Sequence, residues 1–167
     1  MFVTEAAVTE GFKRLAGDLA EELRAIVASA RGDERVAYLV FDLCPEAAFE
    51  AFPISAWMFD SEGQELESPM HAHDLLAGEH LLDPRGAVPL GRADWLGFDT
   101  TPDIELVERV LLQEFQQCWA TVIGDKQRFD AFIGVWRSNL DHEPCPMLNL
   151  STRERCMLDF LWHEGPG

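Results

Sequence analysis

Three histidines in one short segment have the clearest metal-ligand character in this chain. His71 and His73 are two positions apart, so an extended backbone would point both imidazoles to the same side. His80 follows them, and Asp74 and Glu79 lie between. A zinc site needs further ligands, and no His-Glu-x-x-His motif or Cys-x-x-Cys pair supplies them. Surface histidines are the simpler interpretation, and we expect no cofactor.

The carboxylates of the chain are distributed unevenly. Residues 36–84 contain no lysine or arginine but ten of the 30 aspartates and glutamates. Four of these lie in one predicted turn, at Asp60, Glu62, Glu65 and Glu67. Exposed together, they would create a negative field that attracts a basic protein, and the nearby Trp57 would supply an aromatic anchor. The alternative interpretation is a solvated strand edge that only resists aggregation.

Motifs for nucleophilic or nucleotide chemistry are absent from the sequence. It contains no Gly-x-Ser-x-Gly, no Gly-x-x-x-x-Gly-Lys-Ser/Thr and no Gly-x-Gly-x-x-Gly. Because none of the cysteines form a Cys-x-x-Cys pair, reduced thiols are expected. A pairing of Cys145 with His142 or His163 stays open, since such partners meet only in the folded chain. These observations favour a protein that is not an enzyme.

The element that organises the predicted fold is an amphipathic helix over residues 101–123. Thr101 and Pro102 are typical of a helix start, and Gly124 of a helix end. Its apolar residues recur at steps of three and four, which places them on one face. These residues are Ile104, Val107, Leu111, Phe115, Cys118, Trp119 and Val122.

Shorter patterns predict the elements that surround this helix. Residues 5–30 carry one apolar stripe and are predicted to be a helix. Residues 35–42 and 54–60 are rich in β-branched and aromatic side chains and are predicted to be strands. Residues 128–136 fit a strand or a helix, and the run Phe-Ile-Gly-Val-Trp favours a strand.

The C-terminal region is predicted to be a loop followed by a helix. Residues 138–150 contain two prolines and two asparagines, which favours a loop. Ser151-Thr-Arg-Glu154 has the pattern of a capping box, which predicts a last helix. The expected fold is therefore α+β in a single domain, residues 1–167. A mainly antiparallel sheet of about four strands would pack against the helix 101–123 and the N- and C-terminal helices.

The overall charge and hydropathy of the chain restrict the kinds of partner that the protein is expected to bind. Thirty acids against 13 bases give a formal net charge of −17, whereas binding to nucleic acid phosphates needs a basic surface. No run of about 18 apolar residues could span a membrane. The N-terminus lacks the basic and apolar regions of a signal peptide, so a cytoplasmic location is expected. A basic protein is the expected partner, and solubility alone is the other explanation of the charge.

Three short segments give the chain a resemblance to small bacterial domains. Tyr38–Phe41, Phe49–Phe52 and Ala93–Trp95 fall in a predicted order of helix, buried strand, aromatic strand with an acidic turn, irregular segment and long helix. In this order the chain resembles immunity proteins of contact-dependent or polymorphic toxin systems. The resemblance implies a non-enzymatic, cytoplasmic, acidic protein that covers the active surface of a toxin. It implies no particular functional residue.

Three functions are compatible with these patterns. The first is an acidic protein-binding module, most concretely an immunity-type inhibitor of a basic toxin. The second is a metal-dependent enzyme or metal-binding protein that uses His71 and His73. The third is a structural or regulatory subunit whose acidic surface serves only solubility. The absence of catalytic motifs and the base-free segment 36–84 favour the first function.

Overall fold

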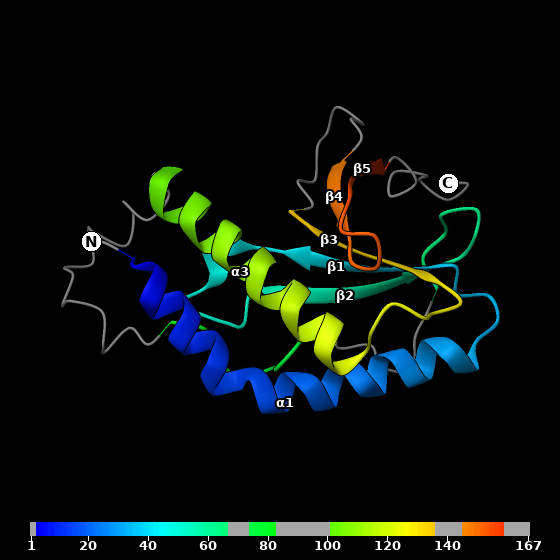
Figure 1. Ribbon diagram of the computed structural model, residues 1–167, viewed down its shortest axis with the longest axis horizontal. Helices are drawn as coiled ribbons and strands as arrows, with labels where there is room; N and C mark the ends of the chain where they lie inside the picture. The colour runs from blue at the N-terminus through cyan, green and yellow to red at the C-terminus, as the bar shows by residue number, and fades with distance from the viewer. Residues whose placement is uncertain (1–2, 67–73, 83–100, 136–144, 159–167) are drawn as a thin grey trace.

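A five-stranded sheet with two long helices on one side makes up the described part of the chain (Figure 1). The computed structural model describes residues 3–66, 74–82, 101–135 and 145–158. In chain order the elements are α1 (Glu5–Gly32), β1 (Tyr38–Leu43), the 3-10 helix η1 (Pro45–Ala47), β2 (Ile54–Phe59), α3 (Thr101–Val122), β3 (Asp130–Gly134), β4 (Cys145–Asn149) and β5 (Arg155–Leu158).

Helix α1 confirms the helix predicted over residues 5–30. The Thr4 hydroxyl accepts a hydrogen bond from the Ala7 amide at 3.1 Å and so caps the first turn. Gly11 lies where the carbonyl oxygen of Leu81 comes so close that a Cβ atom would not fit. The buried apolar side chains recur every three or four residues, at Val8, Phe12, Leu15, Leu19, Leu23, Ile26, Val27 and Ala30.

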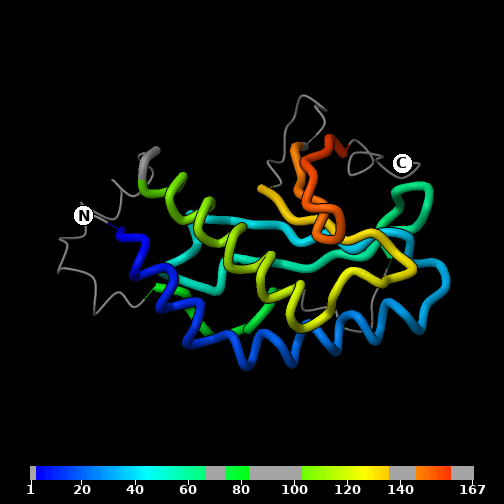
Figure 2. Tube along the Cα trace, viewed as in Figure 1, coloured from blue at the N-terminus to red at the C-terminus, as the bar shows by residue number. Residues whose placement is uncertain are grey.

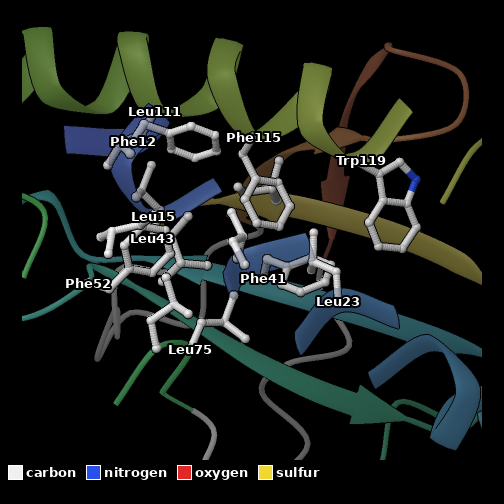
Figure 3. Close-up of a cluster of buried hydrophobic side chains, with 14 of the residues drawn as sticks. Phe12, Leu15, Leu23, Phe41, Leu43, Phe52, Leu75, Leu111, Phe115 and Trp119 are labelled. Carbon is white, nitrogen blue, oxygen red and sulfur yellow. The ribbon is translucent and has the colours of Figure 1, made fainter. Parts of the chain in front are cut away.

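Helices α1 and α3 pack side by side against the same face of the sheet (Figures 1 and 2). Helix α3 confirms the prediction over residues 101–123, although α1 is the longer helix. The rings of Phe115 and Trp119 lie 4.8 and 5.6 Å from the ring of Phe41, centroid to centroid (Figure 3). All three side chains are fully buried, so these aromatic contacts join α3 to β1.

The strand order in the sheet is β2-β1-β3-β4-β5. Strand β1 runs antiparallel to β2 and parallel to β3, while the β3–β4 and β4–β5 pairs are antiparallel. Leu39 and Phe41 of β1 contribute to the core under the helices, and Val40 is buried on the opposite face. This burial on both faces is expected for an internal strand. The strands predicted over 35–42, 54–60 and 128–136 are confirmed as β1, β2 and β3.

The rest of the sheet corrects the prediction in three respects. The sheet has five strands instead of about four, and its β1–β3 pair is parallel within an otherwise antiparallel arrangement. Residues 145–149 form β4, where the sequence predicts a loop. The predicted C-terminal helix is wrong at its start, because residues 151–152 form a turn and residues 155–158 form β5.

Asn149 explains why a hairpin turn forms at the predicted capping box. Its side-chain oxygen accepts hydrogen bonds from the amides of Ser151 and Thr152, at 2.9 and 3.0 Å. The Thr152 hydroxyl accepts the amide of Glu154 at 3.2 Å. Short polar side chains satisfy amides in a turn as well as at a helix start, so the pattern fits both structures. Arg153 closes the turn in the left-handed region, with φ of 63°.

The sheet face away from the helices carries a second, smaller apolar cluster. Its buried members are Val40, Phe59, Phe132 and Met147. Tyr38 and Trp57 are half-buried against it. Because successive side chains of a strand point to opposite faces, the strands supply both clusters at once.

Candidate functional site

The acidic turn after β2 is shaped by one of its own carboxylates. Oδ1 of Asp60 accepts the amides of Glu62 and Gln64, both at 2.9 Å. The Asp60 amide donates to the Gln64 carbonyl at 3.0 Å, and Gly63 adopts a φ of 79°. Asp60 is therefore a turn-forming residue as well as a charge. Glu62 and Glu65 are exposed on the surface of the turn.

The residues predicted to bind a partner are only partly brought together. Asp60, Glu62 and Glu65 lie in one turn, and Glu67 lies outside the described residues. Trp57 is half-buried on the sheet face away from the helices. Glu65 pairs with Phe59 in an isolated antiparallel bridge, and paired residues project to one face, so Glu65 emerges on the same face as Trp57.

A polar pocket of about 550 Å³ opens beside this turn. It lies where β1 and β3 begin and where β2 ends. Its lining residues are Glu34, Arg35, Val36, Ala37, Tyr38, Asp60, Ser61, Arg128 and Asp130. We call it the strand-end pocket.

The backbone of Ala37 holds the three strands together at this pocket. Its amide donates to the Phe59 carbonyl at 2.9 Å, and its carbonyl accepts the Asp130 amide at 3.1 Å. Tyr38 is in register with Phe59 on β2 and with Asp130 on β3. The parallel β1–β3 pairing therefore places Asp60 and Asp130 on either side of the same short stretch of β1.

Arg128 connects the start of β3 to the end of α1. Its two terminal nitrogens donate four hydrogen bonds of 2.8–3.3 Å to backbone carbonyls of one segment, those of Ala30, Asp33, Glu34 and Val36. Carbonyls at the end of a helix lack intrahelical partners and carry the negative end of the helix dipole. The N–H groups of the two terminal nitrogens of Arg128 thus have acceptors within the fold.

Arg35 also has a partner of its own. Its Nε and a terminal nitrogen donate to the two carboxylate oxygens of Asp33, at 3.0 and 2.7 Å. The side-chain hydrogen bond from Arg35, supported by its backbone amide, lowers the pKa of Asp33 to about 2. The same pairing raises the pKa of Arg35. The guanidinium groups of Arg35 and Arg128 therefore form their hydrogen bonds with Asp33 and with backbone carbonyls, and these groups are not among the carboxylates that line the pocket.

The pocket is lined by three carboxylates and by the guanidinium groups of Arg35 and Arg128. Within the described ranges, Glu34, Asp60 and Asp130 form no ion pair, and Glu34 and Asp130 are exposed. Asp60 contributes to the electrostatic environment of Arg35, but the Arg35 guanidinium is bound to Asp33. The charged groups of the lining are therefore mixed, with one more carboxylate than guanidinium group, and the ring of Tyr38 lies among them.

The base-free segment does not form a single acidic surface. Asp60, Glu62 and Glu65 follow the C-terminal end of β2, whereas Asp42 and Glu46 lie at the C-terminal end of β1. Because β1 and β2 are antiparallel, these are opposite ends of the sheet, about 20 Å apart for a six-residue strand. The carboxylates of residues 36–84 therefore do not all lie at one end of the sheet.

The carboxylates at the far end of the sheet are partly compensated. Asp74 accepts a hydrogen bond from the Ser55 hydroxyl at 2.9 Å. Glu79 lies 3.7 Å from Arg14, with both side chains about half exposed. The turn after β2 is thus the better candidate for an acidic binding surface, since it adjoins the strand-end pocket.

The predicted metal-binding segment lies largely outside the described residues. His71 and His73, the two strongest candidate metal ligands, both lie outside the described residues. His80 is described and half-buried, and its carbonyl accepts a hydrogen bond from Arg14 at 2.8 Å. In the part of the chain that the structure covers, no three potential ligands gather around one point.

The described cysteine side chains are not activated thiols. Burial raises the pKa of Cys118 and of Cys156. Burial likewise raises the pKa of Cys44, and the carboxylates of Glu46 and Asp42 raise it further. The Cys44 thiol donates a hydrogen bond to Glu46 at 3.6 Å. Because the thiolate is the nucleophile, these surroundings disfavour nucleophilic catalysis at all three positions.

Sequence patterns missed most of the residues that line the pocket. Glu34, Arg35 and Tyr38 surround the start of β1, and Arg128 and Asp130 surround the start of β3. The sequence did contain an indication of this site, because both predicted strands begin with a charged residue, Arg35 in one and Arg128 in the other. These charged residues indicate a shared site only when the two strands are known to be parallel neighbours, because only then do the starts of both strands lie at the same edge of the sheet.

Across the described residues, no helix is long and apolar enough to cross a bilayer. The chain was also compared with known proteins. No protein-family model, curated protein or solved structure matches it.

Proposed function

We propose that this chain is a non-enzymatic, acidic protein-binding module of the cytoplasm. Its partner is a basic protein, most concretely a toxin that the module inhibits by covering its active surface. The proposal rests on the acidic turn beside the strand-end pocket, where Glu62 and Glu65 are exposed. The neighbouring carboxylates of the pocket form no ion pair with any residue that the structure describes. The net charge of −17 would also attract a basic protein.

Association would proceed in two stages. The negative field of the turn first attracts and orients the basic surface, which raises the rate of encounter. Short-range contacts then form around Trp57 and the pocket, where an aromatic side chain is half-buried on the same face as Glu65. A large aromatic contact in the centre of a polar rim is the usual source of binding energy in protein interfaces.

The chemistry of the described side chains supports binding over catalysis. The thiols of Cys44, Cys118 and Cys156 have raised pKa values. The two guanidinium groups of the pocket are held by Asp33 and by backbone carbonyls, so neither is available to stabilise a developing negative charge.

Binding to a toxin encoded next to this gene would test the proposal. We expect the purified chain to bind such a toxin domain and to suppress its activity in a stoichiometric manner. The variant Glu62→Lys/Glu65→Lys should bind more weakly, and Glu10→Lys/Glu21→Lys is the matched control, because it changes two exposed glutamates of α1 by the same charge. Equal binding by both variants and the unaltered chain would reject the proposed surface.

A further inference from the structure

We propose that the outer edge of strand β5 is a self-association surface, at which two copies of this chain pair into one continuous sheet. The inference concerns a surface other than the acidic turn and goes beyond the proposed function. Strand β5 is last in the strand order, and β4 is its one hydrogen-bonded neighbour among the described strands. An edge strand offers a row of backbone donors and acceptors to a second strand, and a second copy supplies an identical row.

The two edges of the sheet differ in how the described residues cover them. Along the β2 edge, the Leu66 amide donates to the Met58 carbonyl and the Leu75 amide donates to the Ile54 carbonyl, at 2.9 and 3.0 Å. Two isolated bridges lie at the same edge. At the opposite edge, β4 is the one described segment that forms backbone hydrogen bonds with β5. In the described structure the sheet therefore has one covered edge and one edge that can accept a further strand.

The hairpin shows which backbone groups of β5 point outward. The Asn149 amide donates to the Glu154 carbonyl at 2.8 Å, so these residues form a hydrogen-bonded pair just before β5 begins. Bonded and non-bonded pairs alternate between antiparallel strands, so Cys156 also bonds toward β4. The N–H and C=O groups of Arg155 and Met157 consequently point away from β4. These two residues can form the hydrogen bonds to a second copy.

The side chains and charge of the hairpin also suit a second copy. Met157 is 62% exposed and is the one large apolar side chain that is exposed among the described residues. Arg153 and Arg155 against Glu154 give residues 145–158 a net charge of +1, in a chain whose net charge is −17. Two such acidic chains repel each other least where the local charge is not negative. The charge distribution therefore favours contact through this hairpin.

One antiparallel register uses all of these features. When Arg155 of each copy lies opposite Met157 of the other, all the outward backbone groups of both residues are paired. The aliphatic stem of the arginine can then pack on the methionine side chain. A register with Arg155 opposite Arg155 would set like charges against each other. A register with Met157 opposite Met157 would leave Arg155 without a partner among the described residues. In the proposed register, Cys156 lies opposite Cys156 at the two-fold axis.

The pairing leaves the acidic turn accessible. The turn follows β2, which is separated from β5 by the other three strands, or about 19 Å at the usual spacing between strands. The dimer would therefore carry one acidic turn at each outer edge of the joined sheet. Self-association does not require a basic partner, so its failure and the failure of the proposed function are separate results.

Sedimentation velocity of the full-length chain measures the association. The monomer has a mass of 18.8 kDa, and the dimer has twice that mass. A short strand pair buries little surface, so we expect a Kd on the order of 10–100 µM. Because the two chains repel, the dimer should become several-fold tighter between about 0.05 and 0.5 M salt. Binding of a basic protein should weaken over the same range. A chain that stays monomeric at about 500 µM in both salts would overturn the inference.

Two charged substitutions at Met157 test the register without altering the backbone. Met157→Glu should strengthen the dimer, because the new carboxylate would lie opposite Arg155 of the second copy. Met157→Lys should weaken it, because two cations would lie opposite each other. We expect the Kd values of the two variants to differ by about tenfold. Repulsion between whole chains predicts the reverse order, since glutamate makes the chain more negative. Equal Kd values or the reverse order would overturn the inference.

Two further substitutions at the same position test the backbone hydrogen bonds. Met157→Pro removes an outward N–H group and no bond toward β4, and proline is tolerated at such a position of an edge strand. Met157→Val keeps the N–H group and is the matched control. Circular dichroism in the near ultraviolet checks that both variants are folded. The valine variant should dimerise and the proline variant should not. Equal dimerisation of two folded variants would exclude β5 as the interface.

Cys156 supplies a direct measure of the pairing. In the proposed register the two Cys156 residues form a non-hydrogen-bonded pair, with Cα atoms about 4.5 Å apart, which is within the range of a disulfide. Diamide, which takes up the two thiol hydrogens, should therefore link Cys156 to Cys156 in the unaltered chain. Peptide-resolved mass spectrometry identifies the link, and Cys156→Ala should abolish it. A dimer that is linked through other cysteines, or in which Cys156 stays reduced, would overturn the proposed pairing.

Discussion

The guanidinium of Arg128 donates a 2.9 Å hydrogen bond to the carbonyl oxygen of Ala30, a residue 98 positions earlier in the chain. Through this contact the start of β3 is attached to the last turn of α1. The same side chain reaches three further carbonyls in the connection to β1. One residue thus fixes the relative positions of a helix and two strands at the edge of the strand-end pocket.

Arg128→Met should destabilise the fold. The substitution keeps much of the aliphatic length but leaves the carbonyls of Ala30 and Val36, which lie in part-buried bonds, without their donor. Hydrogen bonds to charged groups contribute about 1.5–3 kcal/mol, so we expect a loss of about 2–3 kcal/mol in the free energy of unfolding. Urea denaturation measures this loss. Arg128→Lys should restore only part of it, because an ammonium lacks the planar fork. A change below about 0.5 kcal/mol for Arg128→Met would contradict the assigned role.

Asp33 should make stability depend on pH in the acid range. Arg35 lowers the pKa of Asp33 from 3.8 in its ordinary state to about 2 in the fold. The ionised carboxylate therefore contributes stability that is fully present above about pH 4 and is lost as the pH falls toward 2. Asp33→Asn lacks this contribution but keeps an oxygen for the Arg35 amide. The difference in unfolding free energy between the two proteins should shrink between pH 4 and pH 2, and a constant difference would argue against the ion pair.

Two glycines of α1 should respond in opposite directions to the same substitution. At Gly11 an added Cβ would collide with the Leu81 carbonyl, whereas at Gly17 nothing lies within 4 Å. Gly11→Ala should therefore lower the unfolding free energy by about 1–3 kcal/mol through forced displacement of residues 74–82. Gly17→Ala should raise it by about 0.5–1 kcal/mol through helix propensity. Thermal or urea unfolding of both variants checks the sign, and stabilisation by Gly11→Ala would contradict the close approach.

Cys44 should react slowly with iodoacetamide at neutral pH. Burial and then the carboxylate of Glu46 raise its pKa, which reduces the thiolate fraction. Glu46→Gln removes the second contribution, so alkylation of Cys44 should become faster in that variant. Peptide-resolved mass spectrometry measures the rate, and the partly buried Cys118 serves as an internal reference. An unchanged rate at Cys44 in Glu46→Gln would show that the carboxylate does not act on the thiol.

The long and strongly periodic parts of the fold could be predicted from the sequence. Both helices have apolar stripes of several turns, and their burial follows those stripes. The strands β1, β2 and β3 were also recognisable, because β-branched and aromatic residues concentrate in them. Such helices and strands can be recognised from the local sequence because each one buries a continuous apolar face.

The C-terminal hairpin illustrates where local reasoning fails. Strand β4 is five residues long and contains Pro146, and the turn that follows has a sequence that suits a helix start. The pairing of β4 with β3 decides the structure instead. Gly134 permits this pairing, because a Cβ there would meet the sulfur of Met147 and the carbonyl of Pro146. Contacts of this kind join segments that are far apart in the sequence, so they cannot be recognised from a short stretch of residues.

The candidate site was predictable in its charge but not in its shape. The carboxylates of Asp60, Glu62 and Glu65 could be grouped because they are close in the sequence. The pocket beside them depends on Arg128 and Asp130, which reach it only through the parallel pairing of β3 with β1. The same fold separates Asp42 and Glu46 from the turn, although they belong to one base-free segment.

The central claim is that the acidic turn attracts a basic partner, and the rate of association tests it most directly. Stopped-flow measurements would compare Glu62→Lys/Glu65→Lys with Glu10→Lys/Glu21→Lys, which have the same net charge, at ionic strengths of about 0.02 and 0.5 M. We predict that the turn variant associates at least about tenfold more slowly than the α1 variant at low salt, and that the difference nearly disappears at high salt. Equal association rates of the two variants at low salt would contradict the account.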